Sequence, residues 1–112
     1  MKGIKNIIYE FNGICIFNIS LDNNHIIYKD VSGTITKDKM IEYIRNLYGI
    51  INGWDEEYIS TKLIDNSNWE LEIIFTNGNK KQYRGKSEYP YNFEAFERLN
   101  QELINEVLNG KI

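Results

Sequence analysis

Two acidic residues offer the most direct route to chemistry in this sequence. Glu70 and Glu72 are two positions apart in a segment of alternating polar and apolar residues, so both side chains project from one face of a strand. Two neighbouring carboxylates could serve as the acid and the base of a glycosidase. The surrounding residues indicate neither a raised carboxyl pKa nor a sugar-binding groove. We therefore interpret Glu70 and Glu72 as part of a solvated sheet face.

Other residue types that support catalysis or metal binding are isolated along the chain. His25 is the only histidine and stands beside a turn, where we expect it to be solvated. Cys15 shares the alternation of Phe17 and Ile19, which predicts a small buried side chain and not a reactive thiol. The acidic run at 55–57 lacks the glycine and the alternating ligands of a calcium loop, so we expect an exposed connector. The sequence predicts no catalytic residue, no metal site and no cofactor.

A basic segment at 80–86 (KKQYRGK) could bind nucleic acid, because it interleaves cationic side chains with an aromatic one. Its expected neighbours Glu70, Glu72 and Glu88 would cancel most of the positive field. A net charge of −3 and a pI near 5.2 also give the chain no overall attraction for nucleic acid. Nucleic-acid binding is therefore the alternative to protein binding.

Aromatic residues cluster where the last strand meets the last helix. The cluster comprises Trp69, Tyr89, Tyr91, Phe93 and Phe96. We expect these rings to pack between the last helix and the sheet, and we prefer this interpretation to a ligand cage. An exposed Tyr89 or Tyr91 would suit a protein interface, where tyrosine is enriched. The candidate interface residues are Tyr89, Tyr91, Lys80, Lys81, Arg84 and Lys86.

The first half of the chain has the pattern of three strands followed by a helix. Segments 4–11 and 14–21 alternate apolar and polar residues around an Asn-Gly turn, which is the strongest short hairpin signal. A third strand is expected at 25–32. Thr36 is suited to cap a helix at 37–52, where apolar residues recur at helical spacing.

The second half repeats this order, with strands expected at 58–64, 69–76 and 80–85. Pro90 cannot donate to a sheet and ends the last strand. Asn92 is the expected N-cap of the final helix, and a further expectation is that Tyr91 packs on Phe96 as a hydrophobic staple. The order βββαβββα thus predicts an α+β fold, with an antiparallel sheet of five or six strands covered by two helices.

The hairpin between the last two strands also predicts a register. A three-residue Asn-Gly-Asn loop, with Asn79 in the left-handed region, keeps both apolar faces aligned. This loop sets Glu72 opposite Arg84. It also sets Glu70 opposite Lys86, so that two charge pairs help to select the register.

Composition is that of an ordinary folded domain, and we expect one domain spanning residues 1–112. The lone Cys15 excludes an intramolecular disulfide, and the N-terminal segment has a strand pattern in place of a signal-peptide core. No apolar run approaches the roughly 18 residues of a spanning helix. These features predict a cytoplasmic protein without membrane contact.

The segment from Trp69 to Phe93 has the pattern W-x-L-x-I-x-F-x-N-G followed by G-x-x-x-Y-P-x-N-F. It resembles a pattern in small uncharacterised proteins of clostridia and related low-GC Gram-positive bacteria. The resemblance covers about 40 residues, departs at the segment before Tyr89 and implies a fold but no activity.

The sequence favours a small non-enzymatic binding module that acts through a protein–protein interface. Its size and low-GC composition are compatible with a phage or mobile-element protein that inhibits a host protein, of the anti-defence or anti-CRISPR type. The alternatives are a nucleic-acid-binding sheet surface, or a small-ligand binder or enzyme whose site is scattered along the sequence.

Overall fold

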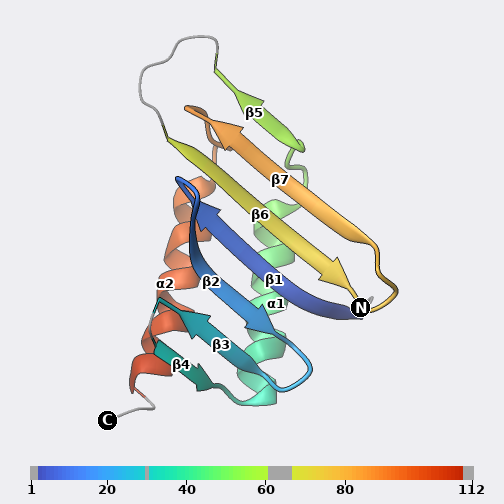
Figure 1. The fold of residues 1–112 in the computed structure, drawn as a ribbon, viewed down its shortest axis with the longest axis vertical. Helices are drawn as coiled ribbons and strands as arrows, with labels where there is room; N and C mark the ends of the chain where they lie inside the picture. The colour runs from blue at the N-terminus through green and yellow to red at the C-terminus, as the bar shows by residue number, and fades with distance from the viewer. Residues whose placement is uncertain (1–2, 30, 61–66, 110–112) are drawn as a thin grey trace.

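The computed structural model describes residues 3–29, 31–60 and 67–109. In this part of the chain the elements are β1 (Ile4–Phe11), β2 (Ile14–Ser20), β3 (His25–Tyr28), β4 (Val31–Thr34), α1 (Lys37–Ile51), β5 (Glu57–Ile59), β6 (Asn68–Phe75), β7 (Lys80–Lys86) and α2 (Phe93–Asn109). The strands form one sheet in the order β4-β3-β2-β1-β6-β7-β5 (Figure 1). The predicted α+β class and the two helices are confirmed, whereas the described sheet has seven strands in place of five or six.

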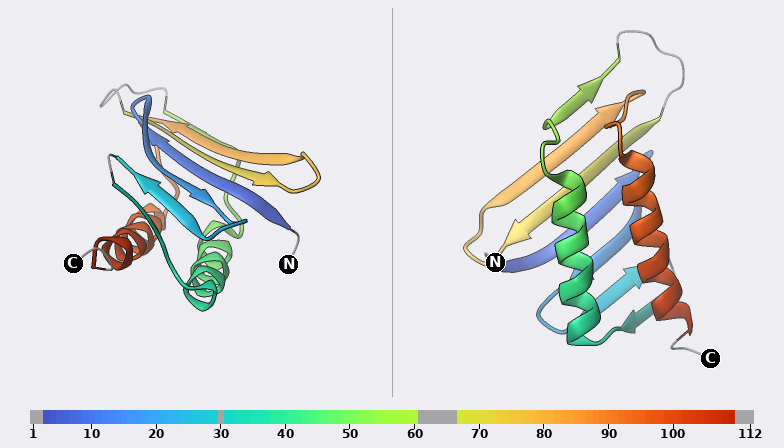
Figure 2. Two further views of the ribbon diagram at one scale, coloured as in Figure 1. Left: turned by 60° about the horizontal axis from the view of Figure 1, so that its bottom comes forward. Right: turned by 180° about the vertical axis from the view of Figure 1, so that it is seen from behind.

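Both helices lie on the same face of the sheet, so the fold has two layers (Figure 2). Each helix buries one apolar stripe at helical spacing against that face. No described element covers the opposite side of the sheet, which we call the open face. The largest fully buried side chains between the layers are Trp69, Phe17, Phe96, Ile7, Ile19, Ile26, Leu47, Leu71 and Ile73.

The additional strand comes from the segment at 25–32. The expected strand at 25–32 turns back on itself, because Lys29 adopts a φ of 54° and Tyr28 pairs with Val31 across a tight hairpin. The expected strand at 58–64 is described only as far as residue 60 and gives β5, whose first residue is Glu57. β5 pairs with β7 in parallel orientation, so the sheet is mixed and not wholly antiparallel.

The predicted register between β6 and β7 is wrong by two residues. Glu70 lies opposite Arg84, and Glu72 lies opposite Gln82. The reason is the position of the loop: the Phe75 N–H donates to the Asn79 carbonyl over 2.8 Å. Gly78, with a φ of 90°, takes the left-handed conformation that we expected at Asn79. The faces of both strands are nevertheless as predicted, because a shift of two residues preserves the alternation.

The prediction of a buried Cys15 is also wrong. Tyr9 pairs with Phe17, but Glu10 pairs with Cys15, so Ile16 is the additional residue of a β-bulge in β2. The bulge moves Cys15 away from the core face, and its side chain is exposed beside Glu10. Without the bulge, Cys15 would lie on the same buried face as Phe17.

The boundaries of α1 agree closely with the prediction. Thr36 Oγ1 accepts a hydrogen bond from the Lys39 N–H over 3.2 Å and caps the first turn. At the other end the Asn52 N–H donates to the Tyr48 carbonyl over 3.0 Å, and Gly53 continues with a φ of 89°. The helix therefore ends at Ile51, one residue before the predicted end.

The predicted interactions at the start of α2 are wrong, although the starting position is correct. The side chain of Asn92 reaches α1: its Nδ2 donates to the Ile50 carbonyl over 2.8 Å, and its Oδ1 accepts from Trp54 Nε1 over 2.6 Å. Tyr91 is 95% exposed and does not form the staple with Phe96. Asn92 therefore connects the beginning of α2 with the end of α1.

The aromatic seam between α2 and the sheet is confirmed for Trp69, Tyr89, Phe93 and Phe96. Tyr91 is exposed and does not belong to it, whereas Trp54 is a member that the sequence did not predict. Trp54 is only 8% exposed, and its ring centroid lies 5.7 Å from Trp69, 5.8 Å from Tyr83 and 6.2 Å from Phe93. Trp54 directly precedes the acidic run at 55–57, which we expect to be an exposed connector. A Trp followed by three acidic residues gave no periodic signal that could have placed it in the core.

Candidate functional site

The open face carries polar and apolar side chains in rows that cross the strands. These residues alternate with the buried ones along each strand, so they project away from the helices. Its central members are Asn6, Ile8, Glu10, Asn18, Ser20, Ile27, Glu70, Glu72, Ile74, Gln82 and Arg84.

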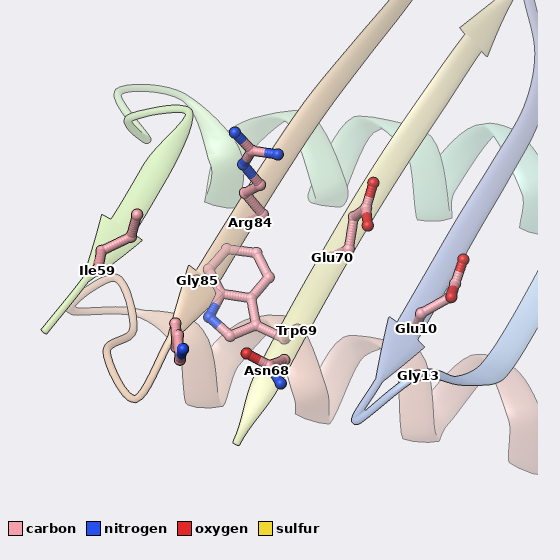
Figure 3. A pocket seen from close by; sticks show the side chains of 9 residues that line it. Glu10, Gly13, Ile59, Asn68, Trp69, Glu70, Arg84 and Gly85 are labelled. Atoms are coloured by element: carbon pink, nitrogen blue, oxygen red, sulfur yellow. The ribbon is translucent and has the colours of Figure 1, made fainter. Parts of the chain in front are cut away.

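One row of the open face is dominated by carboxylates. Glu10 of β1 lies directly opposite Glu70 of β6, and Glu70 lies opposite Arg84 of β7. The Arg84 guanidinium is paired with Glu57 of β5, at 2.9 Å between Nη2 and Oε1. Figure 3 shows Glu10, Glu70 and Arg84 on three neighbouring strands around a shallow depression of about 350 Å³. Two cations line the depression: Arg84, which is paired with Glu57, and Lys86, which lies opposite Asn68. No ion pair among the described residues joins either of them to Glu10 or Glu70.

The side-chain amide of Gln82 forms hydrogen bonds with two glutamates of β6. Gln82 Nε2 donates to Glu70 Oε1 over 3.2 Å and to Glu72 Oε2 over 2.7 Å. Both carboxylates are half-buried, and Gln82 orients them across β6 and β7. The arrangement fixes negative charge at the centre of the open face without neutralising it.

The predicted basic interface residues do not form one patch. Lys80, Arg84 and Lys86 project from the open face, whereas Lys81 lies on the helix side, 5.6 Å from the centre of the Tyr83 ring. Interaction with the Tyr83 hydroxyl raises the pKa of Lys81. Arg84 is already engaged by Glu57, so the basic segment is divided between two faces.

The two predicted tyrosines lie on the helix side, at the start of α2. Tyr89 is half-buried, its ring centroid is 4.9 Å from that of Phe93, and its hydroxyl contacts the Ser67 hydroxyl. Tyr91 extends into solvent beside it. Together with other residues they border a groove of about 510 Å³, the aromatic groove, which is lined by Phe11, Tyr89, Pro90, Tyr91, Phe93, Glu94 and Glu97.

The remaining candidates do not assemble a catalytic or metal site in the described residues. Burial and then Glu10 raise the pKa of Cys15, which keeps its thiol protonated and unreactive. His25 is the first residue of β3 and stands on the open face between Ser20 and Thr34. The described part of the chain contains no group of three or more His, Cys, Asp or Glu side chains that could hold a metal ion.

Comparison of the chain with protein-family models, with curated proteins and with solved structures gave no match. The resemblance to small clostridial proteins therefore stays a prediction. Neither described helix is long and apolar enough to cross a membrane.

Because Glu10 lies opposite Glu70, we expect that removal of the Glu10 charge stabilises the protein. Like charges directly opposite on neighbouring strands destabilise a sheet, so Glu10→Gln is expected to increase the free energy of unfolding by about 0.2–1 kcal/mol. Urea unfolding at low salt measures this change. The increase is expected to shrink in about 1 M salt, where the Debye length falls to about 3 Å. Glu72→Gln is the control, because Glu72 lies opposite Ile8 on β1. A loss of stability in Glu10→Gln would contradict the proposed repulsion.

Proposed function

We propose that this protein is a binding module that recognises another protein through its open face. The observation that carries the proposal is the placement of both helices on one side of the sheet, which leaves the other side free of any described element (Figure 2). Charged, amide and isoleucine side chains share this surface. Such a flat, mixed surface suits a protein partner better than it suits a small molecule, which is usually enclosed in a deeper pocket.

Two features of the open face support a specific contact. Ile27 is 46% exposed and Ile59 is 57% exposed, so apolar side chains are available for burial. Glu10 and Glu70 lie directly opposite each other, so a cationic group of the partner placed between them would be attracted to both carboxylates. A charged residue that costs stability in the free protein is expected at a functional surface.

The central charges count against the nucleic-acid alternative. Glu10, Glu70 and Glu72 occupy the middle of the open face, while Arg84 is paired with Glu57. Phosphate groups would therefore meet negative charge at the centre of the sheet. A cytoplasmic location and an inhibitory role encoded by a mobile element stay predictions from the sequence.

Affinity capture from a lysate of the native host, with and without nuclease, tests the proposal. The immobilised protein is expected to retain one protein in stoichiometric amount, and that protein should survive nuclease treatment. The open-face double variant Glu10→Lys/Ile27→Lys is expected to lose it. Recovery of nucleic acid alone would contradict the proposal.

A matched double variant on the helix side tests whether lost capture is specific to the open face. The alternative cause would be the change in charge or a loss of solubility. Glu102 is exposed on α2 and Leu108 is 37% exposed, so Glu102→Lys/Leu108→Lys makes the same chemical changes away from the open face. This control is expected to capture the same protein as the unchanged chain. Equal loss in both double variants would contradict an interface on the open face.

A further inference from the structure

The aromatic groove lies on the helix side of the sheet and is separate from the open face. Phe11 comes from the end of β1, Tyr89 and Tyr91 from the segment before α2, and Phe93 from the first turn of that helix. Phe93 is 6% exposed and forms part of the floor, while Tyr91 is 95% exposed and stands at the rim. The groove thus offers aromatic surface to a ligand at two depths.

The polar groups of the aromatic groove are acidic. Glu94 and Glu97 are three residues apart on α2, so their side chains are neighbours on one face of the helix. None of the described residues that line the groove carries a positive charge. Burial and then the charge of Glu94 raise the pKa of Glu97. No ion pair among the described residues involves Glu94 or Glu97.

A buried hydroxyl next to the groove adds an unsatisfied acceptor. Tyr9 is 4% exposed, and its hydroxyl has no hydrogen-bond partner in the described structure. Its ring centroid lies 6.4 Å from that of Phe93 in the floor of the groove. Burial, Glu97 and Tyr89 together raise the pKa of this hydroxyl, so two of the three causes are residues that line the groove. Tyr9 does not line the groove itself, so its hydroxyl is an unpartnered polar group behind the floor, under the influence of Glu97 and Tyr89.

We propose that the aromatic groove binds an arginine or lysine side chain from a basic segment of a partner protein. Aromatic faces attract guanidinium and ammonium groups, and the Glu94 and Glu97 carboxylates can accept their hydrogen bonds. Glu94 alone could be explained as a favourable charge at a helix start. Glu97 is exposed and lies in the second turn of α2, so a favourable charge at the helix start does not account for its place in the lining of the groove. The inference does not rest on binding by the open face.

The binding test uses a fluorescein-labelled decapeptide of alternating arginine and serine, measured by fluorescence anisotropy at low salt. A second decapeptide with citrulline in place of arginine keeps the shape of the side chain and removes its charge. The arginine peptide is expected to bind, and the citrulline peptide is expected to bind at least about tenfold more weakly, because the charge-assisted hydrogen bonds are lost. Equal binding of the two peptides would overturn the proposal.

Variants then locate the bound peptide. Glu94→Gln/Glu97→Gln is expected to weaken binding by about tenfold or more, since each carboxylate accepts a charge-assisted hydrogen bond. Glu42→Gln/Glu102→Gln removes two charges from exposed positions of α1 and α2 that belong to neither the aromatic groove nor the open face, and it is expected to leave the affinity unchanged. Equal weakening by both double variants would show general charge attraction and overturn the proposed site.

A second readout follows the groove itself. In the unchanged protein the arginine peptide is expected to lower the pKa of Glu97, monitored by the carboxyl carbon resonance in an NMR titration. Tyr91→Ala is expected to weaken binding without loss of thermal stability, because this side chain is almost fully exposed. Binding that leaves the Glu97 resonance and the Tyr91→Ala affinity unchanged would place the peptide elsewhere and contradict the inference.

Discussion

Gly85→Ala is expected to destabilise the protein by about 3 kcal/mol, the upper part of the range for overpacking a filled core. A β-carbon at Gly85 would lie 2.6 Å from Trp69 Cε2 and 2.5 Å from the Glu88 carbonyl oxygen, and it would also overlap Trp69 Nε1. Trp69 is 2% exposed and has little freedom to move. Its Nε1 donates to the same Glu88 carbonyl over 2.9 Å, so displacement of the ring also breaks that hydrogen bond.

Denaturant unfolding of Gly85→Ala measures the loss, and Gly49→Ala provides the matched control. Gly49 lies inside α1, and a β-carbon there meets nothing within 4 Å. Because alanine is the better helix former, Gly49→Ala is expected to increase stability by about 0.5–1 kcal/mol. An unchanged unfolding midpoint in Gly85→Ala would mean that the Trp69 indole does not pack against the Gly85 backbone as described.

The close contact between Gly85 and Trp69 illustrates what the sequence could establish and what it could not. The apolar–polar alternation of β6 agrees with the structure, because Trp69, Leu71 and Ile73 are buried and Phe75 at the end of the strand is partly buried. It did not predict that Gly85 lies opposite Trp69, because the register depends on which loop residue adopts a positive φ. Asn and Gly both tolerate that conformation, and the sequence contains both in the loop.

The candidate site was less accessible to prediction than the fold. Glu70 could be assigned to an exposed sheet face from its own strand. Its opposition to Glu10 could not be predicted, because β1 and β6 are adjacent in the sheet but are separated by half of the chain. The bulge that brings Cys15 beside Glu10 has no recognisable signal in an apolar run. Local patterns therefore identified the faces of strands, whereas contacts between distant strands required the three-dimensional arrangement.

The aromatic groove shows the same distinction. Its members Tyr89, Tyr91 and Phe93 are contiguous enough to be recognised as a cluster, and Tyr91 was correctly considered for an exposed role. Phe11 joins them from the first strand, and Glu97 from the second turn of α2. Glu94 and Glu97 are close to Phe93 in the sequence, so the member that the sequence could not place is Phe11, which joins the groove because the end of β1 lies beside the start of α2.

Asn92→Ala is expected to destabilise the protein by about 2–4 kcal/mol, because it leaves two groups unpaired at a largely buried contact. The Trp54 indole N–H would lose its acceptor, and the Ile50 carbonyl would lose its donor at the end of α1. Trp54 is 8% exposed and lies among the rings of the core, where water has limited access. The loss is expected in both the free energy of unfolding and the near-ultraviolet circular dichroism of the tryptophans.

Asn92→Ser distinguishes this bridging role from the helix-capping role that the sequence predicted. Serine is about as good an N-cap as asparagine, so capping alone would preserve stability. The shorter serine side chain cannot span both the Trp54 Nε1 and the Ile50 carbonyl. If the two bridging hydrogen bonds of Asn92 matter most, Asn92→Ser is expected to be nearly as unstable as Asn92→Ala. Stability close to that of the unchanged protein would show that helix capping matters most. The bridging result would mean that the start of α2 is held by the end of α1, and that the position of the aromatic groove depends on this contact between the two helices.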